Sequence, residues 1–174
     1  MGSLRRVTIA ALMAALSLVL TRFASVRIAI AGVEGIRLGL GALPNILAGI
    51  LLGPLYGALS GAVADVAGFM LSPMGGYLPH FTLTAALTGA VPGMVFLALQ
   101  RGRKTSPPVL VLGLSIAAGT VLVSWCLTPY FLHTLIGMDY RVILPPRLVA
   151  GLIEVPVYAF VTRTVYARTV RRAS

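Results

Sequence analysis

Residues 47–58 read LAGILLGPLYGA, and this stretch decides how the chain is organised. The pair Gly53-Pro54 breaks helices, and it separates an apolar run over residues 36–52 from a second run over 54–71. A bilayer's hydrocarbon core needs about 20 apolar residues per helix, and both runs approach that length. The stretch therefore predicts two membrane-spanning helices joined by a tight hairpin.

Four more apolar runs flank this hairpin, and the composition of the whole chain agrees with them. They cover about residues 4–20, 81–99, 109–131 and 148–166. The chain has 174 residues, of which 58% are hydrophobic and 10% charged, and its mean hydropathy is +0.96. A soluble domain carries about 25% charged residues, so this chain could not cover a water-facing surface. We expect an all-α membrane protein: one domain over residues 1–174, a bundle of six transmembrane helices with structured outer loops.

The basic residues predict the orientation of this bundle in the cell membrane. Six spans place both termini on one side, together with the loop after residue 100 and nine of the 14 basic residues. Those nine are Arg5, Arg6, Arg101, Arg103, Lys104, Arg163, Arg168, Arg171 and Arg172. Because basic residues accumulate on the cytoplasmic side, both termini are predicted to be cytoplasmic.

Several classes of function find no support in the sequence. The net charge of +10 comes from residues that flank apolar spans, which argues against nucleic-acid binding. The single Cys126 excludes a disulfide framework, and no cluster has metal-ligand spacing. No nucleotide-binding or catalytic motif is present, so we expect neither an enzyme nor a cofactor. Any energy for transport must then come from a partner.

The polar residues at the outer side predict a site for an anionic ligand. Five arginines fall there, against the usual bias: Arg22, Arg27, Arg37, Arg141 and Arg147. Asp65 and Glu154 lie within spans, where ionisable groups are costly and face a cavity or a partner charge. Glu154 is interpreted mainly as structural, paired with Arg147. Asp65 is the better candidate to accept hydrogen bonds from adjacent N–H donors of a ligand. Residues 25–37 alternate apolar residues and glycines, which predicts a hairpin-like lid.

The first helix carries a stripe of small residues. Ala10, Ala11, Ala14 and Ala15 form two overlapping Ala-xxx-Ala pairs. Small residues let helices approach closely in lipid. Composition alone leaves two interpretations open: internal packing, or a docking face for another membrane protein.

Several segments resemble one transporter family in order and spacing. They are GVEGIRLGLGALP at 32–44, LAGILLGPLYGA at 47–58, Asp65 with the following Val-Ala-Gly, FTLTAALTGAVPG at 81–93 and LPPRL at 144–148. Over about residues 8 to 160 the chain resembles the substrate-binding S components of energy-coupling factor (ECF) transporters, folate family. The resemblance implies a membrane subunit that binds a vitamin from outside and docks on a transmembrane coupling protein driven by two ATPase subunits. It also implies that the alanine stripe is the docking face.

The chemistry of folate suits the candidate residues. The pterin edge offers N–H donors side by side to Asp65, and arginine forks suit the two carboxylates of the glutamate tail. Flat rings need aromatic walls. The candidate binding residues are Asp65, Arg37, Arg147, Arg27, Phe69, Tyr77, Phe81 and Trp125. Two alternatives stay open: another pterin- or deazapurine-like vitamin or precursor, or a structural membrane subunit whose arginines bind anionic lipid.

Overall fold

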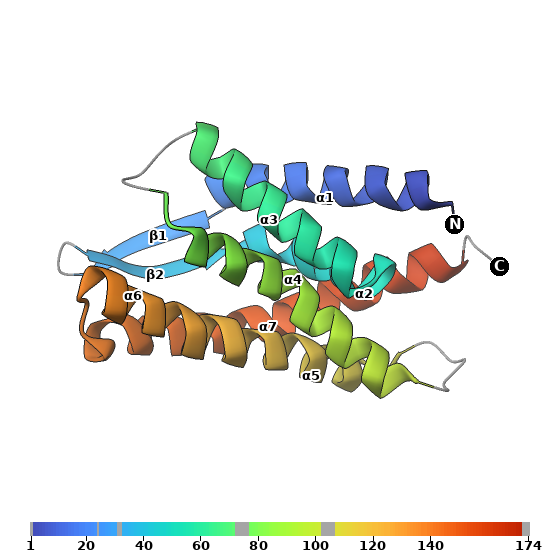
Figure 1. The fold of residues 1–174 in the computed structure, drawn as a ribbon. Helices are drawn as coiled ribbons and strands as arrows, with labels where there is room; N and C mark the ends of the chain where they lie inside the picture. Colours follow the sequence, from blue (N-terminus) through green and yellow to red (C-terminus); the bar gives the residue numbers. More distant parts are fainter. Residues whose placement is uncertain (1, 24, 31–32, 72–76, 102–106, 172–174) are drawn as a thin grey trace.

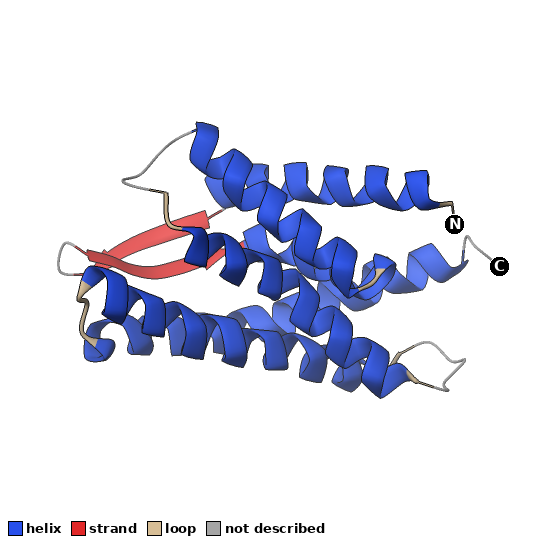
Figure 2. Cartoon of the chain, viewed as in Figure 1, coloured by secondary structure: helices blue, strands red, loops and turns tan. Residues whose placement is uncertain are grey.

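The fold is a bundle of helices with one β-hairpin inserted at one end (Figures 1 and 2). The computed structural model describes residues 2–23, 25–30, 33–71, 77–101 and 107–171. Side chains of the two strands before Gly39, and of residues 170 and 171, lie outside the description. The elements are α1 (Ser3–Phe23), β1 (Ser25–Ile30), β2 (Val33–Gly39), the 3₁₀ turn η1 (Leu40–Ala42), α2 (Leu43–Leu52), α3 (Pro54–Leu71), α4 (Pro79–Gln100), α5 (Val109–Gly119), the π-helical η2 (Thr120–Leu127), α6 (Thr128–Ile136) and α7 (Tyr140–Arg171).

The predicted fold class is confirmed, with one span shorter than the others. Within the described chain, five helices are long and apolar enough to cross a membrane, and the helical stretch Leu40–Leu52 is shorter. Figure 1 places the start of α1 and the end of α7 at one end of the bundle, here called the terminal end. The opposite end carries the β-hairpin and is called the hairpin end. The chain therefore brings both of its ends to one side, as the charge pattern predicts.

The predicted start of the second helix, residue 36, is wrong. Residues 33–39 form β2, which pairs antiparallel with β1 in a register that joins Ser25 to Gly39 and Arg27 to Arg37. The predicted hairpin-like lid is thus a true β-hairpin, and helical structure begins only at Leu40. Thirteen residues at 1.5 Å each span about 20 Å, so this helical stretch crosses only part of a bilayer. The base of the hairpin, at the end of β2, packs against α7.

The predicted start of the last helix, residue 148, is also wrong. α7 begins at Tyr140 and includes Pro145, Pro146 and Pro156. Proline removes a backbone donor, so a proline pair more often lies before a helix or in its first turn than inside it. Membrane helices tolerate prolines where neighbouring groups satisfy the freed carbonyls. The fifth span likewise continues beyond residue 131 to Ile136, through η2 and α6.

Glycines let α2 pack directly against its neighbours at the centre of the bundle. A Cβ atom on Gly49 would lie 2.0 Å from the Gly89 carbonyl oxygen, and one on Gly93 would lie 2.6 Å from that of Gly49. A Cβ on Gly57 would lie 2.6 Å from the Gly49 Cα. These glycines therefore serve close packing of α2, α3 and α4 within the chain. Gly53 differs: its φ of 110° forms the turn between α2 and α3.

A buried polar chain fixes α1, α2 and α3 relative to one another. Asn45 in α2 donates to the Ser17 hydroxyl at 3.0 Å and accepts from Ser60 at 2.8 Å. Ser17 in turn donates to the Gly41 carbonyl at 2.6 Å. Because all of these groups lie in an apolar interior, each bond is costly to break. The frame at the centre of the bundle is therefore well defined.

Candidate ligand-binding site

Asp65 is held in place at the hairpin end of the bundle. It lies on α3, fewer than two turns before that helix ends at Leu71. Thr82, in the first turn of α4, donates to Asp65 Oδ2 at 2.7 Å, and the Tyr77 hydroxyl lies 2.7 Å from the Thr82 hydroxyl. An ionised carboxylate has about four acceptor positions, so the bond to Thr82 leaves capacity for a pair of donors. The site is thus a half-buried carboxylate oriented by a hydroxyl chain.

Two aromatic rings lie next to this carboxylate. The centroids of Phe69 and Tyr77 are 5.2 Å apart and their planes are tilted by 56°. Phe69 follows Asp65 by one turn of α3, and Phe81 precedes Thr82 in α4. These aromatic groups and Asp65 therefore share the α3–α4 end of the bundle.

Trp125 and Arg147 form a second group. The Trp125 indole donates to the Arg147 carbonyl at 3.1 Å, which ties η2 to the early part of α7. Close packing needs Gly151 here, because a Cβ there would lie 2.8 Å from the Trp125 Nε1. His80 and Phe131, with centroids 5.0 Å apart, bring the start of α4 against α6. Trp125 precedes Phe131 by six residues along η2 and α6, so the second group lies towards the same end of the bundle as the first.

Arg27 and Arg37 sit on the hairpin, and their side chains lie outside the described part of the structure. Their Cα atoms are register partners on β1 and β2. The backbone therefore places two cationic residues side by side on the element that occupies this end of the bundle (Figure 1).

Two functional candidates escaped the sequence interpretation: Thr82 and Tyr158. Thr82 orients Asp65, but a threonine in an apolar helix gives no distinctive signal. Tyr158 donates to the Gly39 carbonyl, and Glu154 accepts from the Gly39 N–H at 3.2 Å. The spacing of Glu154 and Tyr158, one turn apart in an apolar span, is a signal that could have been used. The sequence predicted only a pairing of Glu154 with Arg147, and the contact of Glu154 with Gly39 at the base of the hairpin was missed.

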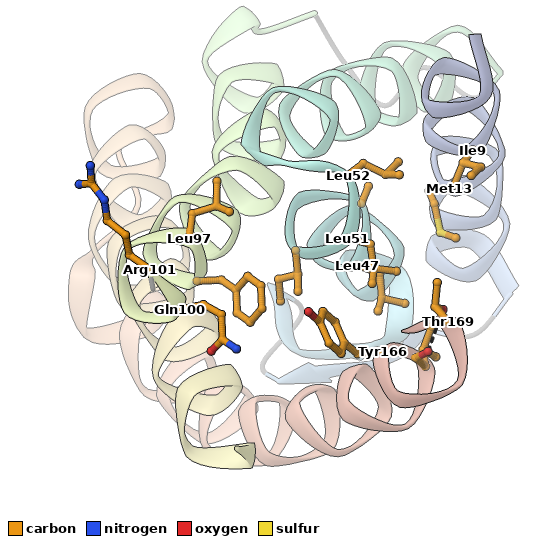
Figure 3. A pocket seen from close by; sticks show the side chains of 14 residues that line it. Ile9, Met13, Leu47, Leu51, Leu52, Leu97, Gln100, Arg101, Tyr166 and Thr169 are labelled. Carbon is orange, nitrogen blue, oxygen red and sulfur yellow. Dashed lines mark hydrogen bonds between the residues drawn. The ribbon is translucent and has the colours of Figure 1, made fainter. Parts of the chain in front are cut away.

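A cavity lies at the other end of the bundle, away from this site. It has a volume of about 720 Å³ and is mostly apolar. Residues of α1, α2, α4 and α7 line it, including Ile9, Met13, Leu51, Leu97 and Tyr166 (Figure 3). Among the predicted ligand-binding residues whose side chains the structure describes, none lines it. It therefore belongs to the terminal end and to a different role.

The two pairs of the alanine stripe lie on different faces of α1. Ala10 and Ala14 are buried, with 6% and 3% of their surface exposed, whereas Ala11 and Ala15 are exposed. Ala10 and Ala14 therefore pack inside the bundle. Only Ala11 and Ala15 are available to another protein.

Comparison with known proteins identifies the family. The model of the S component of ECF-type riboflavin transporters matches residues 1–168. This chain is an S component of an ECF-type transporter. The predicted family is thereby confirmed, and the S component is a multi-pass membrane subunit of a transporter. The structural lipid-binding alternative has no support from this family.

Two relatives are similar to this S component over most of their length. The folate transporter FolT of Clostridium novyi (strain NT) is 35% identical over 151 residues, covering 87% of this chain and 81% of the relative. The crystal structure of a FolT bound with folic acid superposes with a TM-score of 0.73 at 27% identity, covering 93% of this chain and 94% of that one. Another S component, from a bacterial ECF transporter, has a TM-score of 0.64 at 19% identity, covering 99% and 96%, and supports the fold alone.

Proposed function

We propose that this S component binds folate at the hairpin end of the bundle. Asp65 accepts the paired N–H donors of the pterin edge, and the rings of Phe69, Tyr77, Phe81 and Trp125 enclose the flat ring system. Arg37, Arg147 and Arg27 bind the two carboxylates of the glutamate tail. The observation that carries the proposal is Asp65, a half-buried carboxylate fixed at 2.7 Å by Thr82. A hydrogen bond to an ionised carboxylate is stronger than one between neutral groups.

Riboflavin is the second candidate, because the matching family model is named for it. Its ring system also offers polar edges, but its ribityl tail is neutral. Paired arginines on the hairpin would then have no carboxylate to bind. The cross-strand register of Arg27 and Arg37 therefore favours an anionic ligand. Another pterin- or deazapurine-like compound would use Asp65 and fewer of the arginines.

Titration calorimetry of the purified protein tests the ligand. Folate should bind much more tightly than riboflavin or a pterin without the tail. Arg37→Ala should weaken folate binding by about 10- to 100-fold, the worth of one charge-assisted pair, and hardly change binding of the bare pterin. Arg101→Ala removes the same side chain at the terminal end and should change neither. Riboflavin binding as tight as folate, or equal losses for folate and the pterin in Arg37→Ala, would contradict the proposal.

We further propose that the terminal end is cytoplasmic and docks on a transmembrane coupling protein driven by two ATPase subunits. The exposed pair Ala11 and Ala15 supports this assignment. A helix of the coupling protein can approach α1 closely at these two alanines. The apolar cavity is lined from α1 by Ile9 and Met13, which lie on a different face of that helix. Folate is then captured at one end of the bundle and energy is delivered at the other.

Cysteine labelling in intact cells tests this orientation. In a Cys126→Ala background, a cysteine at Ser106 between α4 and α5 should resist a membrane-impermeant reagent until the cells are permeabilised. A cysteine at Met138, between α6 and α7, should react without permeabilisation. Efficient labelling at Ser106 in intact cells would reverse the orientation, and would place the proposed folate site on the cytoplasmic side.

A further inference from the structure

Gly39 joins the hairpin to the helical bundle. β2 ends at this residue and η1 begins immediately after it. Its backbone is extended, with φ −154° and ψ 144°, so the chain changes here from strand to helix in one step. The angle at which the hairpin leaves the bundle therefore depends on how this one peptide segment is held.

Two side chains of α7 hold both polar groups of Gly39. The Glu154 carboxylate accepts from its N–H at 3.2 Å, and the Tyr158 hydroxyl donates to its carbonyl. Glu154 and Tyr158 are one helical turn apart, so they act from the same face of α7.

The surroundings make these bonds costly to lose. Tyr158 is only 3% exposed and packs in the main apolar core, and Glu154 is half-buried. A backbone N–H and C=O that are buried inside the helical bundle of a membrane protein have little water available as an alternative hydrogen-bond partner. An acidic residue in a spanning helix is costly, and it almost always faces a partner group or a cavity inside the bundle. Breaking either bond should therefore release the hairpin base and leave a desolvated group behind.

We propose that Glu154 and Tyr158 are positioning residues for ligand binding, acting through Gly39 and the hairpin. Arg37 lies two residues before Gly39, and Arg27 is its register partner. A fixed hairpin base holds both arginines in place before the ligand arrives, so less ordering entropy is lost on binding. A fixed hairpin slows ligand dissociation, because the ligand leaves when the hairpin moves. The identity of the ligand rests on the proposed function, whereas the fixed hairpin base does not.

Spin-label distances in the ligand-free protein test the fixed base directly. In the Cys126→Ala background, labels at Val33 on β2 and Leu135 on α6 report the position of the hairpin relative to the bundle. Tyr158→Phe removes only the hydroxyl and should broaden the distance distribution. Tyr166→Phe makes the same change on α7 at the terminal end and should leave it narrow. Glu154→Gln keeps an oxygen acceptor and should also stay narrow, whereas Glu154→Ala should broaden the distribution.

Ligand dissociation provides the functional readout. Tyr158→Phe should release folate roughly 3- to 10-fold faster, the ratio that corresponds to one neutral hydrogen bond, with Tyr166→Phe at the wild-type rate. A narrow distribution in Tyr158→Phe overturns the proposal, whether or not dissociation changes. A broad distribution with unchanged dissociation overturns the positioning role. Failure of the wild type to bind folate contradicts the proposed function instead, and the ligand-free distances still decide the hairpin base.

Discussion

Leucine at Ala11 and Ala15 together is expected to abolish folate uptake by the assembled transporter. Both positions are exposed on α1, where added side-chain bulk prevents a second helix from approaching. Binding of folate to the isolated subunit should stay within about twofold of the wild type, because exposed substitutions away from the site change stability by about 0.5 kcal/mol or less. Uptake into cells that express the complete complex, and calorimetry on the isolated subunit, measure the two effects separately.

Two further sets of variants make this test specific. Val121→Phe adds bulk to an exposed position of η2 and should preserve uptake. This element lies between α5 and α6, which are across the bundle from α1 in Figure 1. Ala10→Leu with Ala14→Leu should instead lower both binding and uptake, since overpacking a buried interface costs about 1–3 kcal/mol. If the Ala11/Ala15 variant loses binding and uptake in parallel, that face is needed for folding and the docking proposal fails.

Asp65→Asn should weaken folate binding by more than about tenfold. An amide presents one acceptor oxygen to two ligand donors, and its own N–H₂ group opposes the other donor. Loss of a charge-assisted hydrogen bond costs about 1.5–3 kcal/mol, which corresponds to roughly one to two powers of ten in affinity. A pterin without the glutamate tail should suffer the same loss, because Asp65 is proposed to bind the pterin end. Calorimetry with both ligands measures this directly.

A neighbouring position and a second acid provide the controls for Asp65. Thr82→Val leaves the carboxylate but removes the hydroxyl that donates to it at 2.7 Å. This variant should therefore lose less folate affinity than Asp65→Asn. Asp139→Asn makes the same chemical change in the connection before α7, where Asp139 accepts from the Arg141 N–H at 2.9 Å. It should bind folate normally. Wild-type affinity in Asp65→Asn would remove this residue from the site.

The candidate site was predictable in part, and Asp65 illustrates why. A carboxylate within an apolar span stands out by its cost alone, so the sequence directs attention to it. Its partners do not stand out: Thr82 and Tyr77 come from the far side of a loop, and only the α3–α4 packing brings them to Asp65. Whether Asp65, Arg37 and Arg147 bind the ligand remains a prediction.

The sequence by itself determined the class of protein, the order and approximate positions of the apolar helices, and the hairpin connection at Gly53-Pro54. These follow from hydropathy, helix-breaking residues and charge, which are properties of neighbouring residues along the chain. The common side of the two chain ends followed from the same information. The resemblance of its segments also led to the correct family, because the order and spacing of segments can be read directly from a sequence, whereas contacts between them cannot.

The tertiary structure alone decided where α2 begins, which alanines of α1 face outward, and what Glu154 contacts. Each of these features depends on packing between segments that are far apart in the sequence. Gly39 and Glu154 are 115 residues apart, and Gly39 and Tyr158 are 119 apart. Ala10 and Ala11 are chemically identical neighbours that differ only in which helix face meets the rest of the bundle. Composition and spacing cannot separate such cases, because burial and hydrogen-bond partners are set by packing in three dimensions.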